Sequence, residues 1–180
     1  LLDASRVALR IIGDLLGDLG EQISVSRRIA GVAPDLITSV HDALQFISYY
    51  HSADFVAATH QAYQREQSPA AKSALAQILI NSRMCAEGHR PICQDTGIVV
   101  VFVKAGIEAQ WESGLDLTAA INEGVRRAYT DPDNPLRASV VDDPAGKRSN
   151  TRDNTPAVIH TEIVQGNSVE LFIAAKGGGS

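Results

Sequence analysis

Apolar residues recur at helical spacing through the first half of the chain. Between residues 7 and 19 they fall three or four positions apart, and Gly20 follows as a typical helix stop. A loop at residues 29–34 leads into a second helix, and residues 54–64 and 70–85 predict two more. Stripes of this kind indicate core-facing helices more often than docking helices. The second helix carries its apolar face at Leu36, Val40, Leu44 and Ile47.

Strand patterns dominate the second half. Residues 98–103 are nearly all apolar and rich in β-branched side chains, which predicts a buried strand. Residues 157–164 and 169–175 predict two further strands, and Gly166-Asn167 between them suggests a hairpin. A helix is expected at residues 115–129, followed by a turn cluster at 131–135. We therefore predict an α+β fold, with N-terminal helices followed by a small mixed or antiparallel sheet and flanking helices.

Composition narrows the class of protein. The 180 residues are 44% hydrophobic and 21% charged, as in a globular domain. The net charge of -5 argues against nucleic-acid binding, and no apolar run reaches the length of a membrane span. Charged residues interrupt the first 19 positions, so a signal peptide is not expected and a cytoplasmic location is. Because the chain starts at Leu1 and stops in a glycine run, we expect a piece of a longer protein.

The segment His89–Gly97 concentrates candidate chemistry at the entrance to the first strand. Cys93 stands beside an amide, a carboxylate and a hydroxyl, which favours a ligand or a nucleophile, although free cysteines are usually inert and buried. Asp95 followed by Thr96 and Gly97 is typical of a turn, in which the carboxylate bonds its own backbone. A reactive group on a loop that a strand supports is a common way to build a metal or substrate site.

Other polar residues carry weaker signals. Cys85, His89 and Cys93 could suggest zinc, but a fourth ligand is missing, and Cys85 is interpreted as structural. Arg137 is either a fork for a carboxylate or a solvated surface residue. The run 176–180 is either a flexible tail or a nest of N–H groups for an anion. The polar stretch with Arg148, Arg152 and Asp153 has a lower weight, and His41, His51, His60 and His160 show no partner pattern.

The longest motif, residues 81–97, closely resembles the N-terminal region of class I fumarate hydratases. These are oxygen-sensitive iron–sulfur hydro-lyases related to the alpha part of L-tartrate dehydratase. Residues 134–141, 150–157 and 176–180 resemble the same family, and residues 42–51 do so more weakly. The resemblance divides the chain into an unmatched N-terminal helical segment, 1–35, and a portion of a catalytic domain, 36–180, truncated at its C-terminus.

The resemblance also implies roles for single residues. Cys93 would be one of three cysteines that hold a 4Fe-4S cluster, whose fourth iron is open to substrate. Gln94 and Asp95 would face the substrate, with Asp95 as the catalytic proton carrier. Arg137 would bind a substrate carboxylate, as would the glycine nest at Gly178 and Gly179.

The function implied is that of the N-terminal domain of a fumarate hydratase, which converts fumarate reversibly to (S)-malate in the tricarboxylic acid cycle. The alternatives are a tartrate or methyl-fumarate hydro-lyase of the same family, or a non-catalytic interaction fragment. The expected ligand is a small dicarboxylate, and the full-length parent is expected to be a homodimer that binds neither nucleic acid nor membrane. The isolated chain is expected to fold and to be inactive, because one motif thiolate cannot complete the cluster.

Overall fold

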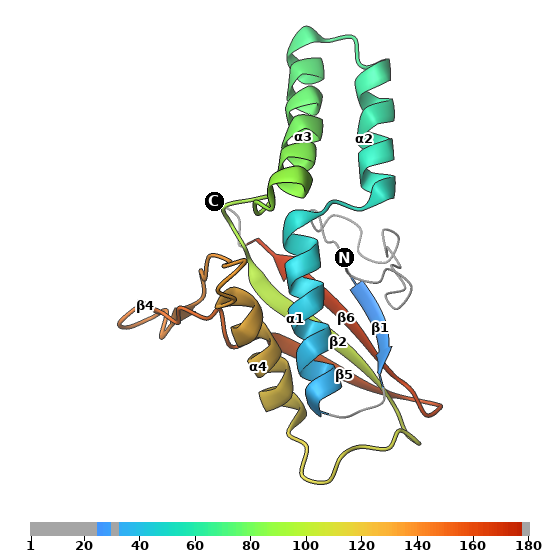
Figure 1. The fold of residues 1–180 in the computed structure, drawn as a ribbon, viewed down its shortest axis with the longest axis vertical. Coiled ribbons are helices and arrows are strands. Elements are labelled where there is room, and N and C mark those ends of the chain that lie inside the picture. The colour runs from blue at the N-terminus through green and yellow to red at the C-terminus, as the bar shows by residue number, and fades with distance from the viewer. Residues whose placement is uncertain (1–24, 30–32, 178–180) are drawn as a thin grey trace.

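The computed structural model describes residues 25–29 and 33–177 and confirms the α+β fold (Figure 1). The helix expected at residues 7–19 and the glycines Gly178 and Gly179 lie outside the described residues. The elements, in chain order, are β1 (Val25–Ile29), α1 (Ala33–Tyr49), α2 (Ala53–Arg65), α3 (Pro69–Gly88), β2 (Ile98–Gly106), α4 (Leu117–Tyr129), β3 (Val141–Asp142), β4 (Ser149–Asn150), β5 (Val158–Val164) and β6 (Val169–Lys176).

The helices begin and end at residues that suit their termini. Pro69 occupies the first turn of α3, where its missing N–H costs nothing. The same helix stops at His89, which adopts a left-handed conformation and donates its N–H to the Cys85 carbonyl. Asp116 caps α4, because its carboxylate accepts the Ala119 N–H at 2.9 Å. The helices predicted within the described residues are confirmed as α1, α2, α3 and α4.

The main sheet has four strands in the order β1-β6-β2-β5. Strand β6 runs antiparallel to β2, whereas β5 runs parallel to β2 on its other side. The predicted hairpin of β5 and β6 is therefore wrong, because β2 lies between these two strands. Their connection crosses the end of β2, where Gly106 donates to the Ser168 carbonyl at 2.8 Å. A Cβ at Gly106 would lie 2.4 Å from the Gly166 oxygen, so this crossing requires glycine.

Strand β1 differs from the sequence prediction, which gives a helical segment at residues 1–35 and places the strands after the helices. It pairs antiparallel with β6, with Val25 opposite Ile173 and Ile29 opposite Val169. Its sequence, VSRRI, is short and half polar, so it lacks the apolar run by which the other strands could be recognised. Strand β1 is an edge strand of the sheet, next to β6.

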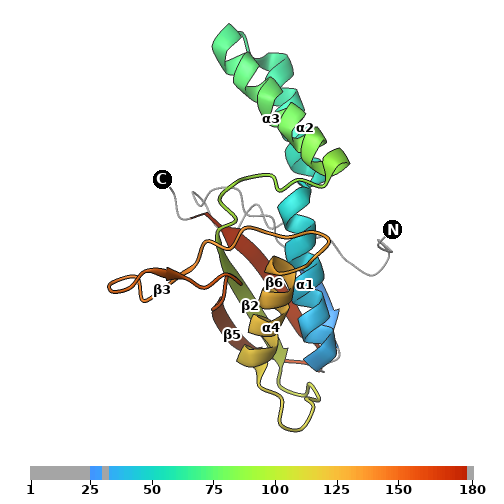
Figure 2. The same ribbon diagram turned by 60° about the vertical axis from the view of Figure 1, so that its left-hand side comes forward.

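Helices α1 and α4 pack against each other and cover one face of the sheet (Figures 1 and 2). Alternate residues of β2 point into this layer, and Val99, Val101 and Val103 are at most 1% exposed. The opposite face is more open. There Phe102 stacks on His160, with ring centroids 5.0 Å apart. The largest side chains fully buried in the core are Leu36, Leu44, Ile121, Leu171 and Ile173.

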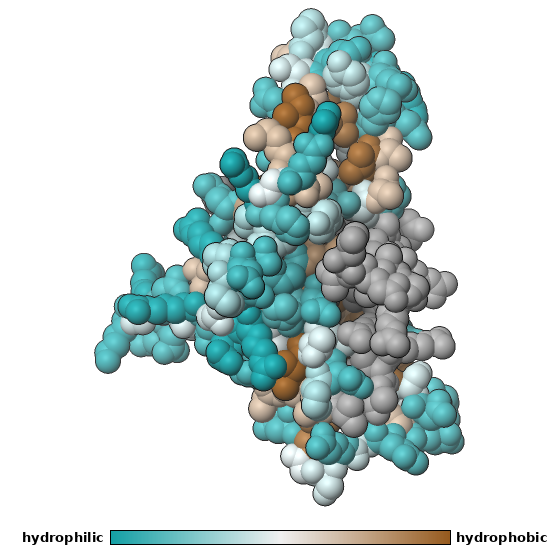
Figure 3. All heavy atoms as spheres, viewed as in Figure 1, coloured by the Kyte–Doolittle hydropathy of each residue, from teal (hydrophilic) through white to brown (hydrophobic). Residues whose placement is uncertain are grey.

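Two parts project from this core. The α2–α3 hairpin extends beyond the sheet, and the β3–β4 arm extends to one side (Figures 1 and 2). The hairpin exposes hydrophobic side chains, among them Ile80 and Met84, and brown spheres mark hydrophobic residues on it in Figure 3. Among the described helices, none combines the length and the apolar character that crossing a bilayer requires.

Gly124 allows the close packing of α4 on α1. A Cβ at this position would lie 2.7 Å from the Val40 Cβ and 2.8 Å from the Ile37 carbonyl oxygen. We expect Gly124→Ala to lower the free energy of unfolding by about 1–3 kcal/mol, because a backbone atom must move to admit the methyl group. Chemical denaturation of the chain measures this change.

The matched control is Gly88→Ala in α3. Its added methyl group would meet only the flexible Arg90 side chain, at 3.7 Å. This control should change stability much less. An equal or smaller loss for Gly124→Ala would show that the two helices separate easily, contrary to this description of the core.

Candidate functional site

The motif loop, residues 89–97, leaves the end of α3 and is held at its middle by two helices. The Ile92 N–H donates to the Ser48 carbonyl of α1 at 2.8 Å. The Ile92 carbonyl accepts the Asn81 side-chain amide of α3 at 3.1 Å. With both backbone groups of Ile92 bonded, the next residue, Cys93, projects from a fixed point, and its thiol is exposed.

The loop then divides into an exposed and a buried part. Cys93, Gln94 and Asp95 are exposed, whereas Thr96 and Gly97 are buried. The Asp95 Oδ1 accepts the Gly97 N–H at 3.0 Å, so the predicted turn is confirmed. Gly97 has a φ of +74°, and a Cβ there would lie 2.6 Å from the Lys176 carbonyl carbon, so glycine is required.

Arg137 lies beside this loop although it is 43 positions from Gln94 in sequence. Its Nη1 donates to the Gln94 carbonyl at 3.2 Å. The Thr96 hydroxyl donates in turn to the Arg137 carbonyl through a short hydrogen bond. The structure therefore brings Cys93, Gln94, Asp95 and Arg137 together. Whether they act on a ligand stays a prediction.

The glycine run begins at the same place. A Cβ on Gly177 would lie 3.1 Å from the Asp95 Oδ2, so the two residues are close neighbours. The predicted nest residues, Gly178 and Gly179, lie beyond the described part of the chain. The contact with Gly177 nevertheless places the start of the run against the motif loop.

Two buried residues, Tyr129 and Asn154, donate hydrogen bonds to backbone carbonyls of the motif loop. The Tyr129 hydroxyl donates to the Thr96 carbonyl at 3.0 Å. Burial raises the pKa of Tyr129 to about 12, although hydrogen bonds with Thr96 and Asn154 oppose this shift. Asn154 is fully buried and donates to the Gly97 carbonyl at 3.0 Å. Tyr129 is the last residue of a predicted helix, and Asn154 lies in a segment that resembles the family, but neither the patterns nor the resemblance assigns a role to either residue.

The donor set fits a partial contribution to an iron–sulfur cluster. Such clusters are held mainly by thiolates, and Cys93 offers an exposed thiol. Cys85 is 3% exposed, and burial raises the pKa of its thiol, which disfavours the thiolate that a metal requires. Within the described residues, no three His, Cys, Asp or Glu side chains lie together as a metal site. Of the two cysteines, Cys93 therefore has the exposed thiol and Cys85 the buried one.

The remaining candidates make other contacts. His89 packs edge-on against Tyr49, with ring centroids 5.5 Å apart. The Arg148 Nε donates to the Pro144 carbonyl at 3.0 Å and so closes its own arm. Asp153 accepts the Thr155 N–H at 3.0 Å, which makes it a turn residue.

Comparisons with known proteins agree on one family. A profile of the family described as fumarate hydratase (Fumerase) matches residues 37–180. A putative L(+)-tartrate dehydratase subunit alpha of Methanocaldococcus jannaschii is 31% identical over 73% of the chain and 46% of its own length. An aerobic class I fumarate hydratase of Escherichia coli is 32% identical over 89% of the chain and 30% of its own length. The chain therefore spans less than half the length of these curated relatives.

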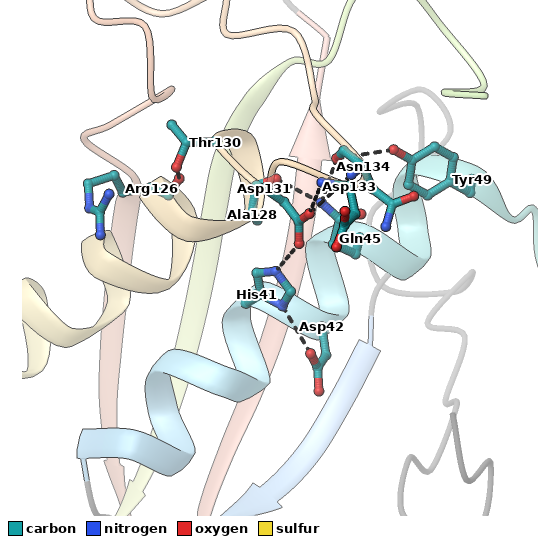
Figure 4. Close-up of polar contacts among 10 residues, drawn as sticks. All are labelled: His41, Asp42, Gln45, Tyr49, Arg126, Ala128, Thr130, Asp131, Asp133 and Asn134. Carbon is teal, nitrogen blue, oxygen red and sulfur yellow. Dashed lines mark hydrogen bonds and ion pairs between the residues drawn. The ribbon is translucent and has the colours of Figure 1, made fainter. Parts of the chain in front are cut away.

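A second polar cluster joins α1 to the end of α4 (Figure 4). The His41 Nδ1 lies 3.0 Å from the Asp42 Oδ1, and its Nε2 lies 3.1 Å from the Asp131 Oδ2. The sequence shows no partner pattern for His41, and the structure gives it two carboxylate partners. Because neutral imidazole has only one N–H, two carboxylate partners favour the imidazolium. The hydrogen bond with Asp42 is the main cause that raises the pKa of His41, burial opposes it, and Asp131 adds to it.

The same region fixes the turn that leads to Arg137. The Gln45 amide donates to the Ala128 carbonyl at 2.7 Å and to the Asn134 carbonyl at 3.0 Å. The Asp131 Oδ1 accepts the backbone N–H of Asn134 at 3.0 Å, which confirms the predicted turn cluster. Helix α1 therefore positions the start of the segment that carries Arg137.

The His41 cluster predicts a pH-dependent stability. Because the pKa of His41 is raised in the folded state above its ordinary value of 6.5, its stabilisation is complete below that value. It is lost as the pH rises through the folded-state pKa. We expect His41→Gln to lower the free energy of unfolding more at about pH 6 than at about pH 8.5.

Urea denaturation at both pH values measures the difference between the wild type and the variant. His60→Gln serves as the control, because His60 is an exposed residue of α2. A loss of the same size at both pH values would contradict a charged His41.

Proposed function

The chain belongs to the fumarate hydratase (Fumerase) family, and we propose that it is the N-terminal part of an iron–sulfur hydro-lyase that converts fumarate reversibly to (S)-malate. The observation that carries this proposal is the meeting of an exposed thiol, Cys93, a carboxylate, Asp95, and a guanidinium, Arg137, at one end of the sheet. Curated relatives named class I fumarate hydratase support it.

Cys93 is the proposed cluster ligand of this chain. Its thiolate is a soft donor, and the bonds that hold Ile92 fix the backbone from which it projects. When bound, a 4Fe-4S cluster with an open iron supplies a Lewis acid for substrate oxygen atoms. The other ligands belong, in this proposal, to the part of the full-length protein outside this chain.

Arg137 is the proposed carboxylate fork. The Gln94 carbonyl uses one N–H of its guanidinium and so orients the group. The remaining N–H donors can bind a substrate carboxylate in a bidentate manner. We propose that the glycine run, with Gly178 and Gly179, offers backbone N–H groups for a carboxylate of the same small dicarboxylate.

Asp95 is the proposed proton carrier. Hydration adds a hydroxyl group to one alkene carbon and a proton to the other, so a group must give and take a proton. The Gly97 N–H occupies the Oδ1 of Asp95, which leaves Oδ2, on the side of Gly177, for this exchange. Because the turn holds Oδ1, the position of Oδ2 is fixed before substrate arrives.

A second candidate substrate is tartrate, because one relative is named a putative L(+)-tartrate dehydratase subunit alpha. We propose a homodimer for the full-length protein.

The direct test is to reconstitute the full-length protein anaerobically with iron and sulfide and to assay fumarate, tartrate and methyl-fumarate. Turnover of one of them identifies the substrate, whereas no turnover and no cluster absorbance would favour a non-catalytic interaction fragment. We expect no turnover by the isolated chain, since it supplies one exposed thiol.

The two cysteines give a matched pair of variants in the full-length protein. Cys93→Ala should abolish turnover and weaken or abolish the visible cluster absorbance, because an iron loses its thiolate. Cys85→Ala should retain both, since the Cys85 thiol is buried against Asn81 and Pro91. Equal loss of absorbance in the two variants would contradict the assignment of Cys93.

The two charged residues of the proposed site, Asp95 and Arg137, should have separate kinetic effects. Asp95→Asn keeps the shape of the side chain but cannot carry the proton, so kcat should fall by about 100-fold or more while the cluster absorbance persists. Arg137→Lys replaces a planar fork by a point charge, so it should mainly raise KM. Steady-state kinetics separates the two. If Arg137→Lys leaves both parameters unchanged, Arg137 is a surface residue.

A further inference from the structure

Asn154 is the one polar side chain among the largest fully buried side chains of the described structure. It lies between the β3–β4 arm and β5, and its φ is +62°. Its Oδ1 accepts two backbone N–H groups, from Ser139 at 2.8 Å and from Val140 at 3.0 Å. Its Nδ2 donates to the Gly97 carbonyl at 3.0 Å. A single side chain thus joins two loops that are distant in sequence.

The chemistry of this junction suits asparagine. It requires an acceptor for two donors and, on the same short side chain, a donor for a carbonyl. Aspartate supplies only acceptors when ionised, and its second oxygen would face the Gly97 carbonyl. Alanine and glycine supply neither group. Asparagine also tolerates positive φ better than most residues, which fits the backbone at Asn154.

The two loops joined in this way carry the proposed site. Gly97 closes the turn that orients Asp95, and Ser139 follows closely after Arg137. The Ser139 hydroxyl also donates to the Gly97 carbonyl, at 3.4 Å. Loosening the junction would let the Arg137 segment move relative to the Asp95 turn, without touching either side chain.

We propose that Asn154 is a positioning residue that sets the distance between Arg137 and the motif loop. This inference rests on the proposed function, since it assigns Arg137 to substrate binding. It predicts that Asn154 determines substrate affinity through Arg137, whereas a residue needed only for folding would change the amount of active protein. The two possibilities differ in KM, which does not depend on how much enzyme is folded.

The test compares two variants of the full-length protein. Asn154→Gly keeps the freedom to adopt positive φ but removes all three hydrogen bonds, and Asn154→Asp keeps the acceptor but loses the donor. We expect both to raise KM for the dicarboxylate by about tenfold, with a smaller change in kcat, as for the loss of a buried hydrogen bond. Asn167→Asp makes the same chemical change in the exposed β5–β6 connection and should leave KM unchanged.

Hydrogen exchange gives a readout that does not depend on activity. In the Asn154 variants, exchange should rise in peptides that cover residues 93–99 and 134–141. In Asn154→Gly the Ser139 and Val140 N–H groups lose their acceptor, and in Asn154→Asp that acceptor loses its bond to the Gly97 loop. Peptides from α2 should exchange as in the wild type. Uniformly faster exchange over the whole domain would indicate a folding role and overturn the proposal, as would failure of both variants to fold.

A double-mutant cycle with Arg137→Lys completes the test. If Asn154 acts through Arg137, the effect of Asn154→Gly on KM should nearly disappear in the Arg137→Lys background. Additive effects would overturn the proposal. Failure of the proposed function is a separate result, seen as no turnover of any dicarboxylate by the wild type. Exchange would then decide alone, and unchanged exchange at residues 134–141 in Asn154→Gly would overturn the junction.

Discussion

The site depends on one constraint, which is that the buried turn at Thr96 and Gly97 must have partners for its backbone carbonyls. Leaving such a group unpaired away from water costs about 1–3 kcal/mol. Tyr129 bonds the first carbonyl and Asn154 the second. Because these partners come from α4 and from the segment before β5, the turn has one position relative to the core. The exposed side chain of Asp95 inherits that position through its bond to the Gly97 N–H.

The topology of the sheet explains why three distant segments meet at this turn. Strand β2 begins directly after the motif loop, its parallel neighbour β5 begins after Asn154, and its antiparallel neighbour β6 ends at Lys176. Both strand starts and the end of β6 lie at the same end of the sheet. With a β5–β6 hairpin, β2 would not lie between these two strands, and the start of β5 and the end of β6 would not both lie beside β2. The crossing at Gly106, at the far end, makes the arrangement possible.

The elements with strong periodicity could be predicted from the sequence. The apolar face of α1 and the β-branched run of β2 specify their own structure, because each must bury its apolar side chains. Strand pairing could not be predicted, since β5 and β6 have the same pattern whether or not β2 separates them. Of the candidate site, the motif with Cys93 and Asp95 stood out by composition and resemblance. Asn154 could not be recognised, because its role depends on a tertiary contact and an asparagine near a turn usually has a local one.

The buried hydrogen bonds that hold the turn at Thr96 and Gly97 join uncharged groups. Tyr129, Thr96 and Asn154 bond through hydroxyl, amide and backbone groups, which can be buried at low cost when paired.

Two arginines of α4 show the opposite arrangement. Arg126 and Arg127 both bond Glu123, and these hydrogen bonds hold the pKa of that carboxyl at about 2. Within the described part of the chain, Arg137 has no such carboxylate partner. The neutral Gln94 carbonyl orients it instead. A guanidinium that is oriented but not neutralised keeps its full attraction for an incoming carboxylate. An arginine in an internal ion pair would first have to break that pair. Fixing the site with neutral hydrogen bonds therefore leaves its charge available for the dicarboxylate that we propose it binds.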